Sequence, residues 1–272
     1  MENLLDFTVL LSVYNKESPN YLDLSLESIW DKQSLKPNQI VLVQDGPLTL
    51  SLYSVIEKWK SKLNDVLTLV PLKENVGLAA ALNEGLKYCK YEIIARMDTD
   101  DIALPNRFEQ QISFLKANPH IAVCSGQIIE YSEDLTIKLS SRKVPLEHNE
   151  IKKFAKKRNP ISHPCVAFKK SSVLSVGGYP SIYPEDYPLW ILMLQKGYQF
   201  ANIPQTLVKM RVGDALTNRR GFKFLKGEIQ IFKLMLEIGF INKKEYYINI
   251  IQRSFLRLAP HSIKKFLYKS IR

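Results

Sequence analysis

Short apolar runs and amphipathic segments alternate along the first half of the chain. The apolar runs resemble strands buried on both faces, and they lie at residues 7–13, 40–43, 67–71, 92–97 and 121–125. Between them, apolar residues recur at helical spacing at residues 21–30, 51–62, 77–88 and 105–117. Strands and helices that alternate in this way are joined by right-handed crossovers. The pattern predicts an α/β fold with a Rossmann-like, mainly parallel central sheet covered by helices on both faces.

An acidic turn ends the fourth of these strands. Asp98, Asp100 and Asp101 follow the strand directly. Ligands of an α/β sheet bind outside the carboxyl ends of its strands, so we expect this turn at the mouth of a site. Carboxylates this close together cannot all ionise unless a cation or hydrogen-bond donors compensate them, and oxygen ligands suit Mg²⁺ or Mn²⁺. The alternative is a solvated turn in which Asp100 or Asp101 caps the helix that begins near Pro105.

Other candidate binding residues are expected at the same edge, because parallel strands gather their carboxyl ends there. A pyrimidine base requires a ring to stack on and a carboxylate to accept its imide N–H, and Tyr14 and Asp45 supply these groups. At the start of the third helix, Gly77 permits close backbone approach to an anion. Arg96, just before the acidic turn, can bind a phosphate through its guanidinium. Further candidates in these segments are Asn15, Glu17, Asn75 and Asn83. Each of these residues also has a purely structural alternative. Tyr14 could be a core aromatic, Asp45 part of a turn with Gly46, and Gly77 a packing glycine. Arg96 could form an ion pair with Asp98 or Asp101.

Composition indicates one sizeable α/β body. Of the 272 residues, 46% are apolar and 24% are charged, which is ample for a large core. We find no stretch of about 18 uninterrupted apolar residues and no signal-peptide pattern at the start, so we expect a cytoplasmic protein. The cysteines, Cys89, Cys124 and Cys165, are widely spaced without a C-x-x-C pair. This spacing predicts small buried residues and argues against disulfides or a zinc site.

The net charge of +11 is concentrated at one end of the chain. Residues 1–216 hold 25 lysines and arginines against 24 acidic residues, whereas residues 217–272 hold 13 against three. This break places a boundary near Asn218. We therefore expect a near-neutral catalytic body at 1–217 and a basic helical appendage at 218–272.

Five sequence blocks together resemble a known family. They are SVYN at 12–15, VLVQDGP at 41–47, NVGLAAALNEGL at 75–86, ARMDTDDIALPNRF at 95–108 and PEDYPLW at 184–190. In order and spacing they resemble the inverting family-2 glycosyltransferases with the GT-A fold, over about residues 5 to 215. Within that family the chain is most similar to the bacterial branch that builds exopolysaccharide and O-antigen repeat units, including the amylovoran-type enzymes. The resemblance implies a nucleotide-sugar-binding half at 1–125 and an acceptor-binding half at 126–217.

The resemblance also implies roles on the donor side. Tyr14 and Asp45 would hold uracil, and the contact rests on Asp45 alone because Gln44 stands where the family often has an acidic residue. Asp98 would contact the ribose, and Asp100 would bind Mn²⁺ or Mg²⁺. Such an ion stabilises the negative charge that develops on a departing nucleoside diphosphate.

The acceptor side is expected between residues 162 and 190. By resemblance, Asp186 is the general base that accepts the proton of the acceptor hydroxyl in a single inverting displacement, with Glu185 beside it. Gly178 and Tyr179 lie in a loop suited to close approach of the substrate, and Trp190 is a further candidate contact. The simpler interpretation of the acidic pair is a helix cap, a role compatible with that of a base.

Two further basic residues, Arg211 and His163, are considered as site residues. Arg211, followed by Arg219 and Arg220, is expected to reach the donor pyrophosphate from a mobile loop. His163 precedes an apolar run, a position more typical of a hydrogen-bonded structural histidine than of a ligand.

The basic tail predicts helices at 222–238, 243–258 and 262–271. In the second, Tyr247, Ile251, Phe255 and Leu258 form one apolar stripe. Basic amphipathic helices suggest contact with an anionic membrane, which fits a lipid-linked saccharide acceptor and a peripheral position on the cytoplasmic face of the inner membrane. The alternative is that the stripes pack against the body or against a second subunit in a homodimer.

Three other functions are less consistent with the sequence. A sugar-nucleotide-forming nucleotidyltransferase would need a glycine-rich, lysine-bearing phosphate loop after the first strand and would leave Asp186 without a role. A non-enzymatic nucleic-acid binder is suggested by the basic charge, but the acidic turn would repel phosphate. A processive synthase would bring spanning helices and a Gln-x-x-Arg-Trp motif, and the chain has neither. We therefore predict transfer of a hexose or N-acetylhexosamine from a UDP-sugar to a lipid-linked oligosaccharide, without a nucleic-acid partner.

Overall fold

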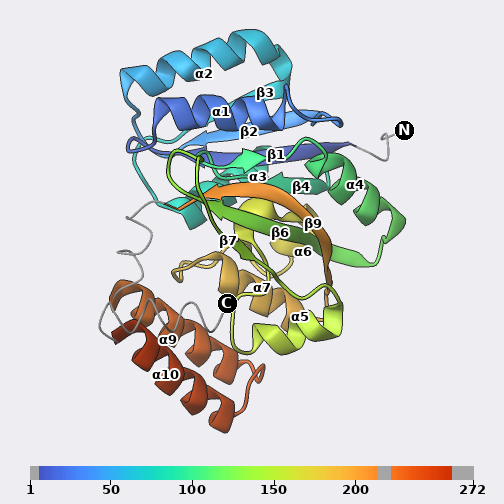
Figure 1. Cartoon of the computed structure of the whole chain (residues 1–272), viewed down its shortest axis with the longest axis vertical. Helices are drawn as coiled ribbons and strands as arrows, with labels where there is room; N and C mark the ends of the chain where they lie inside the picture. The colour runs from blue at the N-terminus through green and yellow to red at the C-terminus, as the bar shows by residue number, and fades with distance from the viewer. Residues whose placement is uncertain (1–5, 213–221, 259–272) are drawn as a thin grey trace.

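One nine-stranded sheet forms the centre of the protein (Figure 1). The structure is a computed structural model that describes residues 6–212 and 222–258. The strands are β1 (Phe7–Val13), β2 (Gln39–Gln44), β3 (Leu67–Pro71), β4 (Ile93–Arg96), β5 (Ile102–Ala103), β6 (Ile121–Tyr131), β7 (Lys138–Arg142), β8 (Ala167–Lys169) and β9 (Gln199–Arg211). Their order is β3-β2-β1-β4-β8-β6-β9-β5, and β7 pairs with β6.

The first four strands in space form the predicted parallel half of the sheet. β1 pairs in parallel with β2 and with β4, and β2 pairs in parallel with β3. In this register Val13 lies opposite Gln44 at the ends of β1 and β2, and Leu10 lies opposite Arg96 at the end of β4. The carboxyl ends of these strands therefore meet at one edge, as the sequence predicted.

The second half of the sheet is mixed, so the prediction of a mainly parallel sheet holds for the first half only. β8 runs antiparallel between β4 and β6, and β5 runs antiparallel to β9, while β6 and β9 are parallel. After β6 the chain turns directly back as β7, and a short turn of this kind joins antiparallel strands only. β6 also runs six residues past the predicted end at Ser125, through residues that pair with β7 and β9.

Helices cover both faces of the sheet, as predicted. They are α1 (Pro19–Ile29), α2 (Leu50–Leu63), α3 (Leu78–Tyr88), α4 (Arg107–Ala117), α5 (His148–Ala155), α6 (Lys170–Leu174), α7 (Asp186–Gln195), α9 (Phe222–Glu237) and α10 (Lys243–Leu258), with 3-10 turns at η1 (Asn64–Val66) and η2 (His163–Cys165). Side chains alternate along β1: Val9 and Leu11 enter the core under α1, α2 and α4, and Leu10 enters the core under α3, α5 and α7. Cys89, Cys124 and Cys165 are buried free thiols, which confirms the prediction for the cysteines.

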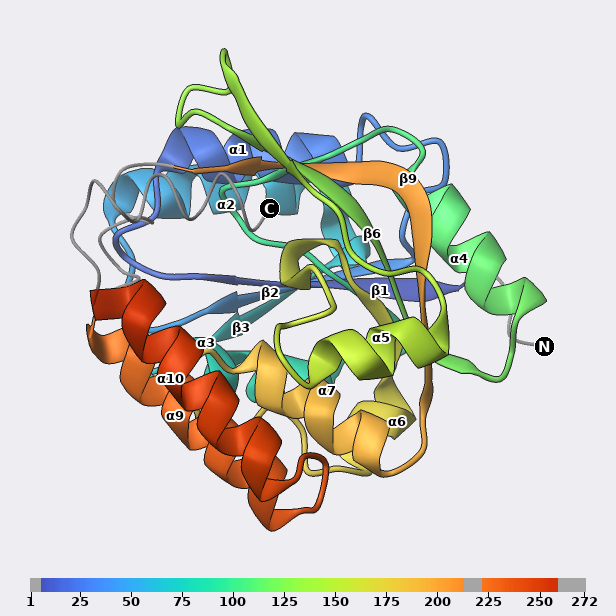
Figure 2. The same cartoon turned by 60° about the horizontal axis from the view of Figure 1, so that its bottom comes forward.

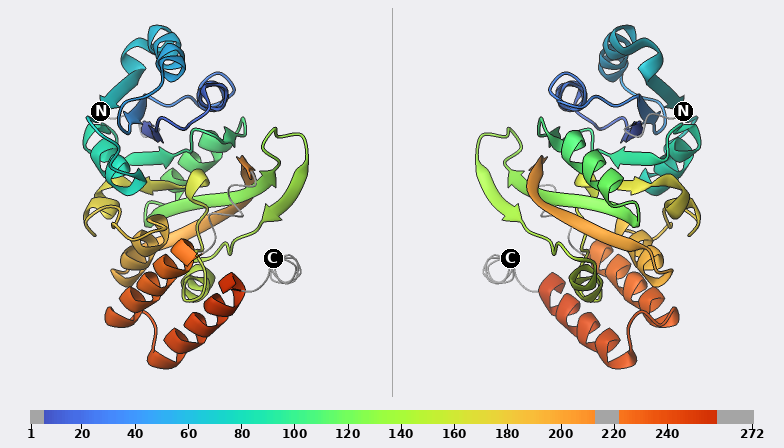
Figure 3. Two further views of the ribbon diagram at one scale, coloured as in Figure 1. Left: turned by 90° about the vertical axis from the view of Figure 1, so that its left-hand side faces the viewer. Right: turned by 90° about the vertical axis from the view of Figure 1, so that its right-hand side faces the viewer.

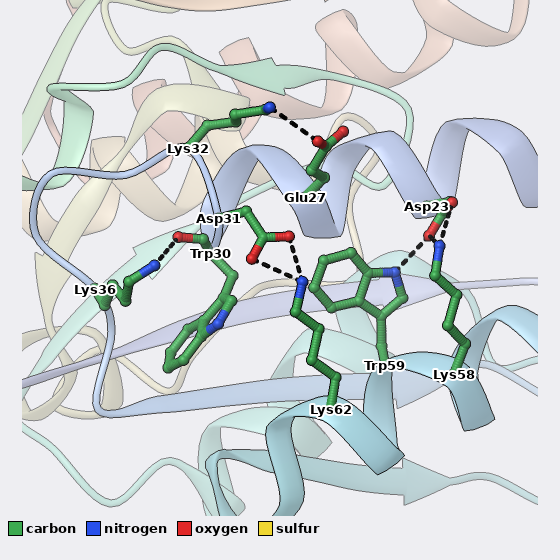
Figure 4. A network of polar contacts seen from close by, with 9 residues as sticks. All are labelled: Asp23, Glu27, Trp30, Asp31, Lys32, Lys36, Lys58, Trp59 and Lys62. Carbon is green, nitrogen blue, oxygen red and sulfur yellow. Dashed lines mark hydrogen bonds and ion pairs between the residues drawn. The ribbon is translucent and has the colours of Figure 1, made fainter.

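Helices α1 and α2 are joined by the polar network of Figure 4. Asp23 accepts hydrogen bonds from Lys58 Nζ at 2.7 Å and from the indole nitrogen of Trp59 at 2.6 Å, and Lys62 pairs with Asp31 at 2.5 Å. These ion pairs are partly exposed and each contributes only about 0–1 kcal/mol. The buried Trp59 ring contributes more, because its apolar surface leaves water while its N–H keeps an acceptor.

The hairpin of α9 and α10 lies outside α7, at the opposite end of the molecule from α1 and α2 (Figures 2 and 3). Ile231, Phe232 and Met235 of α9 are fully buried in the same core as α7, so α9 packs on the body. At Gly227 an added Cβ would lie 1.7 Å from the carbonyl oxygen of Tyr183, which shows how closely the two backbones approach. Among the described residues, no helix is long and apolar enough to cross a membrane. The third predicted tail helix, at 262–271, lies outside the described residues.

Candidate active site

The acidic turn gathers three carboxylates after β4. Oxygen atoms of Asp98, Asp100 and Asp101 all lie within 4.8 Å of one another. Burial, followed by the negative charges of Asp98 and Glu17, raises the pKa of Asp100 to about 7. Burial and its acidic neighbours raise the pKa of Asp101 well above its ordinary value. The turn therefore carries negative charge that the fold compensates only in part.

Two hydrogen bonds hold the turn against the start of the chain. Ser25 on α1 donates its hydroxyl to the carbonyl oxygen of Asp98 at 2.9 Å. Thr99 donates its hydroxyl to Glu17 at 2.7 Å, which joins the loop after β1 to the acidic turn. Glu17 thus lies at the predicted site, where it supports the turn.

Arg211 supports the same turn from β9. Its Nε donates to the carbonyl oxygen of Asp100 and its Nη1 donates to that of Glu133, both at 2.6 Å, while its guanidinium lies 4.1 Å from the ring centre of Tyr21. Its main-chain N–H donates to Asp101 at 2.9 Å. The expectation that Arg211 lies in a mobile loop is wrong, because the residue ends β9 and its guanidinium is engaged within the protein. Its contact with the donor pyrophosphate stays a prediction. Arg219 and Arg220 lie outside the described residues.

Arg96 is buried beside the turn with part of its guanidinium unpaired. Its Nη2 forms an ion pair with Asp98. Its Nε and Nη1 are buried and have no hydrogen-bond partner within the described residues. Buried N–H groups without acceptors are costly, so this guanidinium is suited to an incoming anionic oxygen.

The predicted base-binding residues lie together at the carboxyl edge, but the carboxylate of Asp45 is already engaged. It accepts hydrogen bonds from the main-chain N–H groups of Val76 at 2.7 Å and Gly77 at 3.2 Å, and from the side chain of Asn75 at 3.0 Å. Gly77 has a φ of +83° and precedes α3, whose first N–H groups need acceptors. Asp45 and Asn75 thus fix the loop before α3, and their contact with a nucleotide stays a prediction.

Tyr14 and Asn15 follow β1 directly at this edge. Tyr14 is partly exposed and Asn15 is exposed. The carbonyl oxygen of Tyr14 accepts a hydrogen bond from the main-chain N–H of Glu17 at 3.0 Å, which shapes a turn here. Both side chains are therefore placed where a ligand at the strand ends can meet them.

Asn83 and Gly178 contact each other instead of open solvent. The amide of Asn83 donates to the carbonyl oxygen of Tyr179 at 2.8 Å and accepts from its main-chain N–H at 2.7 Å. An added Cβ at Gly178 would lie 2.4 Å from the Asn83 oxygen. The close approach predicted at this glycine is real, but it joins the two halves of the protein, and the Asn83 amide is used within the chain.

The Glu185–Asp186 pair stands at the start of α7. Asn159 donates its side-chain amide to Asp186 at 2.5 Å. Burial raises the pKa of Asp186, and the bond from Asn159 and the charges of Arg142 and Arg96 oppose that shift. Burial and the adjacent Asp186 raise the pKa of Glu185 to about 7. Because Glu185 occupies the cap position without a side-chain capping bond, simple helix capping does not explain the pair.

Asn159 is a site residue that the sequence did not reveal. Its side-chain oxygen accepts from the N–H of Ile161 at 3.1 Å, and its carbonyl oxygen accepts from Arg142 at 3.0 Å, so its amide is fixed toward Asp186. It lies 27 positions before Asp186 in a loop with no motif of its own. The dipeptide Asn-Pro at 159–160 is typical of a turn and carries no signal for a catalytic role.

The remaining acceptor-side candidates are more deeply placed. His163 lies 3.2 Å from the hydroxyl of Tyr179, and burial together with the charge of Arg96 lowers the pKa of His163 well below its ordinary value. This confirms the structural interpretation of the histidine. Trp190 is fully buried beside Phe168 and Phe200, so its predicted contact with the acceptor is wrong. α7 turns this position toward the sheet.

Electrostatic effects connect the acidic turn with the Glu185–Asp186 pair. Burial raises the pKa of Tyr179, and the charges of Arg96, Asp186 and Glu185 all act on the same hydroxyl. Arg96 also acts on both members of the acidic pair. The charge of Arg96 therefore acts on groups of both the acidic turn and the acidic pair.

Comparison with known proteins identifies the family. The model of glycosyl transferase family 2 matches residues 8–176. The amylovoran biosynthesis glycosyltransferase AmsE of Erwinia amylovora is 42% identical over 271 residues, which cover 98% of this chain and 99% of AmsE. The chain belongs to glycosyl transferase family 2. A second relative of this glycosyltransferase, the UDP-Gal:alpha-D-GlcNAc-diphosphoundecaprenol beta-1,3-galactosyltransferase of Escherichia coli, is 38% identical over 267 residues, or 97% of this chain and 96% of that protein.

Solved structures share the fold of this family-2 glycosyltransferase. The mannosyltransferase PcManGT from Pyrobaculum calidifontis, in complex with GDP-Man and Mn²⁺, has a TM-score of 0.65 at 21% identity, covering 93% of this chain and 70% of that chain. S. aureus TarS 1–349 in complex with UDP-GlcNAc has a TM-score of 0.66 at 18% identity, covering 92% of this chain and 72% of that chain. The predictions of the GT-A fold and of a glycosyltransferase are confirmed.

The acidic turn of this glycosyltransferase fits a divalent cation. Its three carboxylates converge on one point and supply only oxygen ligands, the kind that Mg²⁺ and Mn²⁺ prefer. The raised pKa of Asp100 shows that its charge is poorly compensated within the protein. A cation bound between Asp98, Asp100 and Asp101 would remove this repulsion.

Proposed function

We propose that this glycosyltransferase moves a hexose or N-acetylhexosamine from a UDP-sugar to a sugar hydroxyl of a lipid-diphosphate-linked saccharide, in the synthesis of a surface polysaccharide. The names of the two relatives support the pathway and the acceptor class. The observation that carries the proposal is that Arg96 forms an ion pair with Asp98 of the acidic turn and also acts electrostatically on the Glu185–Asp186 pair, while its Nε and Nη1 have no hydrogen-bond partner among the described residues and suit a diphosphate.

The donor is assigned to residues 1–125 and the acceptor to residues 126–217, with 218–272 as an appendage. Tyr14 stacks on the uracil, Asp98 binds the ribose, and Arg96 donates to the diphosphate. Asp100 holds Mn²⁺ or Mg²⁺ together with its neighbours. When bound, such an ion stabilises negative charge on the departing UDP.

Asp186 is the general base of the proposed reaction. It takes the proton of the acceptor hydroxyl while that oxygen bonds to the anomeric carbon from the side opposite UDP, so the configuration inverts. Asn159 positions the carboxylate, and the low-polarity surroundings that raise its pKa also make it a stronger base. Glu185 shares the negative charge of the pair and lies beside the acceptor.

The test is UDP release and product formation with a panel of UDP-sugars and a synthetic lipid-diphosphate-GlcNAc acceptor, with and without Mn²⁺ or Mg²⁺. We expect transfer that requires a metal and a product of inverted anomeric configuration. Asp186→Asn should lower transfer by about 10²- to 10⁴-fold while UDP binding is retained. Wild-type transfer by this variant would exclude Asp186 as the base, and failure of every donor would exclude the proposed reaction.

A further inference from the structure

Helix α10 carries a row of apolar residues that faces away from the protein. Tyr247, Ile248, Ile251 and Phe255 are 62%, 42%, 68% and 64% exposed, and we refer to these four residues as the outward face. Asn249, on the opposite side of the helix, is only 4% exposed. A helix packed on a globular body normally buries its apolar side and exposes its polar side. Tyr246 and Ile250 do pack against the core, but Tyr247, Ile251 and Phe255 of the predicted stripe do not, which contradicts the alternative that this stripe packs against the body.

Buried polar contacts fix this orientation. Arg257 donates to both carboxylate oxygens of Glu228 on α9, at 2.9 and 3.0 Å, and Arg253 lies 3.5 Å from the same carboxylate. Asn249 donates to the carbonyl oxygen of Lys156 at 2.8 Å. Rotating α10 to bury the outward face would strand Glu228 without its arginines, and an unpaired buried charge is strongly unfavourable. The polar contacts of α10 therefore keep the residues of the outward face exposed.

We propose that the outward face of α10 docks on an anionic lipid bilayer. Lys243 and Lys244 are exposed at the start of the helix. The following segment, 259–272, contains four lysines and arginines and no acidic residue. Exposed aromatic and aliphatic side chains beside basic ones match an interfacial helix, which inserts its apolar side at the lipid headgroups and attracts anionic lipid.

Charge favours a bilayer over a second copy of the chain. Two copies that met through their outward faces would bring together the exposed Lys243 and Lys244 of each copy, which lie one turn from Tyr247 and Ile248. Like charges facing each other across an interface cost several kcal/mol in general. An anionic membrane supplies the opposite charge over a wide area.

Docking through α10 would bring the acceptor side of the site to the membrane, a consequence that rests on the proposed function. α10 donates hydrogen bonds to the carbonyl oxygens of Lys156 and Lys157, just before the Asn159 that holds Asp186. α9 packs at Gly227 against Tyr183, just before the acidic pair. The hairpin therefore lies directly against both segments that position the base, so a lipid-linked acceptor in the same bilayer meets the site.

The experiment is flotation of the full chain with vesicles of phosphatidylglycerol and phosphatidylethanolamine, compared with phosphatidylcholine vesicles. We expect binding to the anionic vesicles only. The double variant Ile251→Ser with Phe255→Ser should bind at least about tenfold more weakly, since both side chains would leave water on docking. The matched control is Leu50→Ser, which removes an 86% exposed leucine from α2 at the other end of the molecule and should bind like wild type.

Two results would overturn the docking proposal: absence of wild-type binding, or equal binding by the double variant. Sedimentation is measured in parallel, and a wild-type dimer that becomes a monomer in the double variant would show that the outward face binds a second copy instead. Transfer to a water-soluble acceptor analogue separates this proposal from the proposed function. If that transfer proceeds while vesicle binding fails, only docking is excluded; if vesicle binding holds while all transfer fails, only the reaction is excluded.

Discussion

Removal of the Asn159 amide tests whether this residue sets the proton affinity of Asp186. Hydrogen bonds to charged groups contribute about 1.5–3 kcal/mol, and one pKa unit corresponds to about 1.4 kcal/mol. The 2.5 Å bond stabilises the ionised form of Asp186, so Asn159→Ala should raise the pKa of the carboxylate by about 1–2 units. A base acts only when it is deprotonated, and activity is lost as pH falls through its pKa. The acidic limb of the pH–rate profile should therefore move about 1–2 units toward higher pH.

The assay is kcat/KM for transfer between pH 5 and 9, in parallel with UDP affinity at a fixed pH. UDP affinity should be unchanged, and at a pH on the acidic limb the rate should fall by about 10- to 100-fold. Asn118→Ala is the control, because it removes an amide hydrogen bond to a main-chain carbonyl on α4, away from the acidic pair. An activity loss equal at every pH, without movement of the limb, would refute the positioning role and leave Asn159 a structural residue.

The other predictions concern the metal-binding turn, the free guanidinium and the junction between the halves. The folded-state pKa of Asp100, about 7, exceeds its ordinary value of 3.8, so ionisation of Asp100 destabilises the metal-free protein as pH rises from about 4 to 7. Asp100→Asn should therefore raise the melting temperature at pH 8 by a few degrees, and it should abolish Mn²⁺ binding in calorimetry. Unchanged Mn²⁺ affinity would contradict the assignment of Asp100 as a metal ligand. Arg96→Gln should weaken UDP binding by about tenfold or more, whereas equal UDP affinity would mean that Arg96 serves only Asp98. Asn83→Ala should lower the free energy of unfolding by about 1–3 kcal/mol in urea titrations, because the main-chain N–H and carbonyl oxygen of Tyr179 both lose their hydrogen bonds to Asn83. A change below about 0.5 kcal/mol would show that water replaces these two hydrogen bonds.

The sequence determined the parallel half of the fold and the acidic turn. β1 and β3 begin and end where the sequence predicted. In β1 the reason is a continuous apolar run, which is buried on both faces of the strand. The turn at Asp98 to Asp101 follows from the same logic, since charged residues directly after a buried strand must emerge at its carboxyl edge. Local pattern was sufficient in these places.

The tertiary structure decided which of these side chains are free to act. The side-chain amide of Asn83 bonds to Tyr179, 96 positions away, and the guanidinium of Arg211 bonds to the carbonyl oxygen of Asp100, 111 positions away, so both groups are engaged within the protein. Trp190 and the outward face of α10 show what helical spacing alone does not determine. Helical spacing tells which residues share a side, but only the packing partners decide whether that side turns inward. At α10 the buried ion pairs with Glu228 fix an orientation in which one row of apolar residues stays exposed.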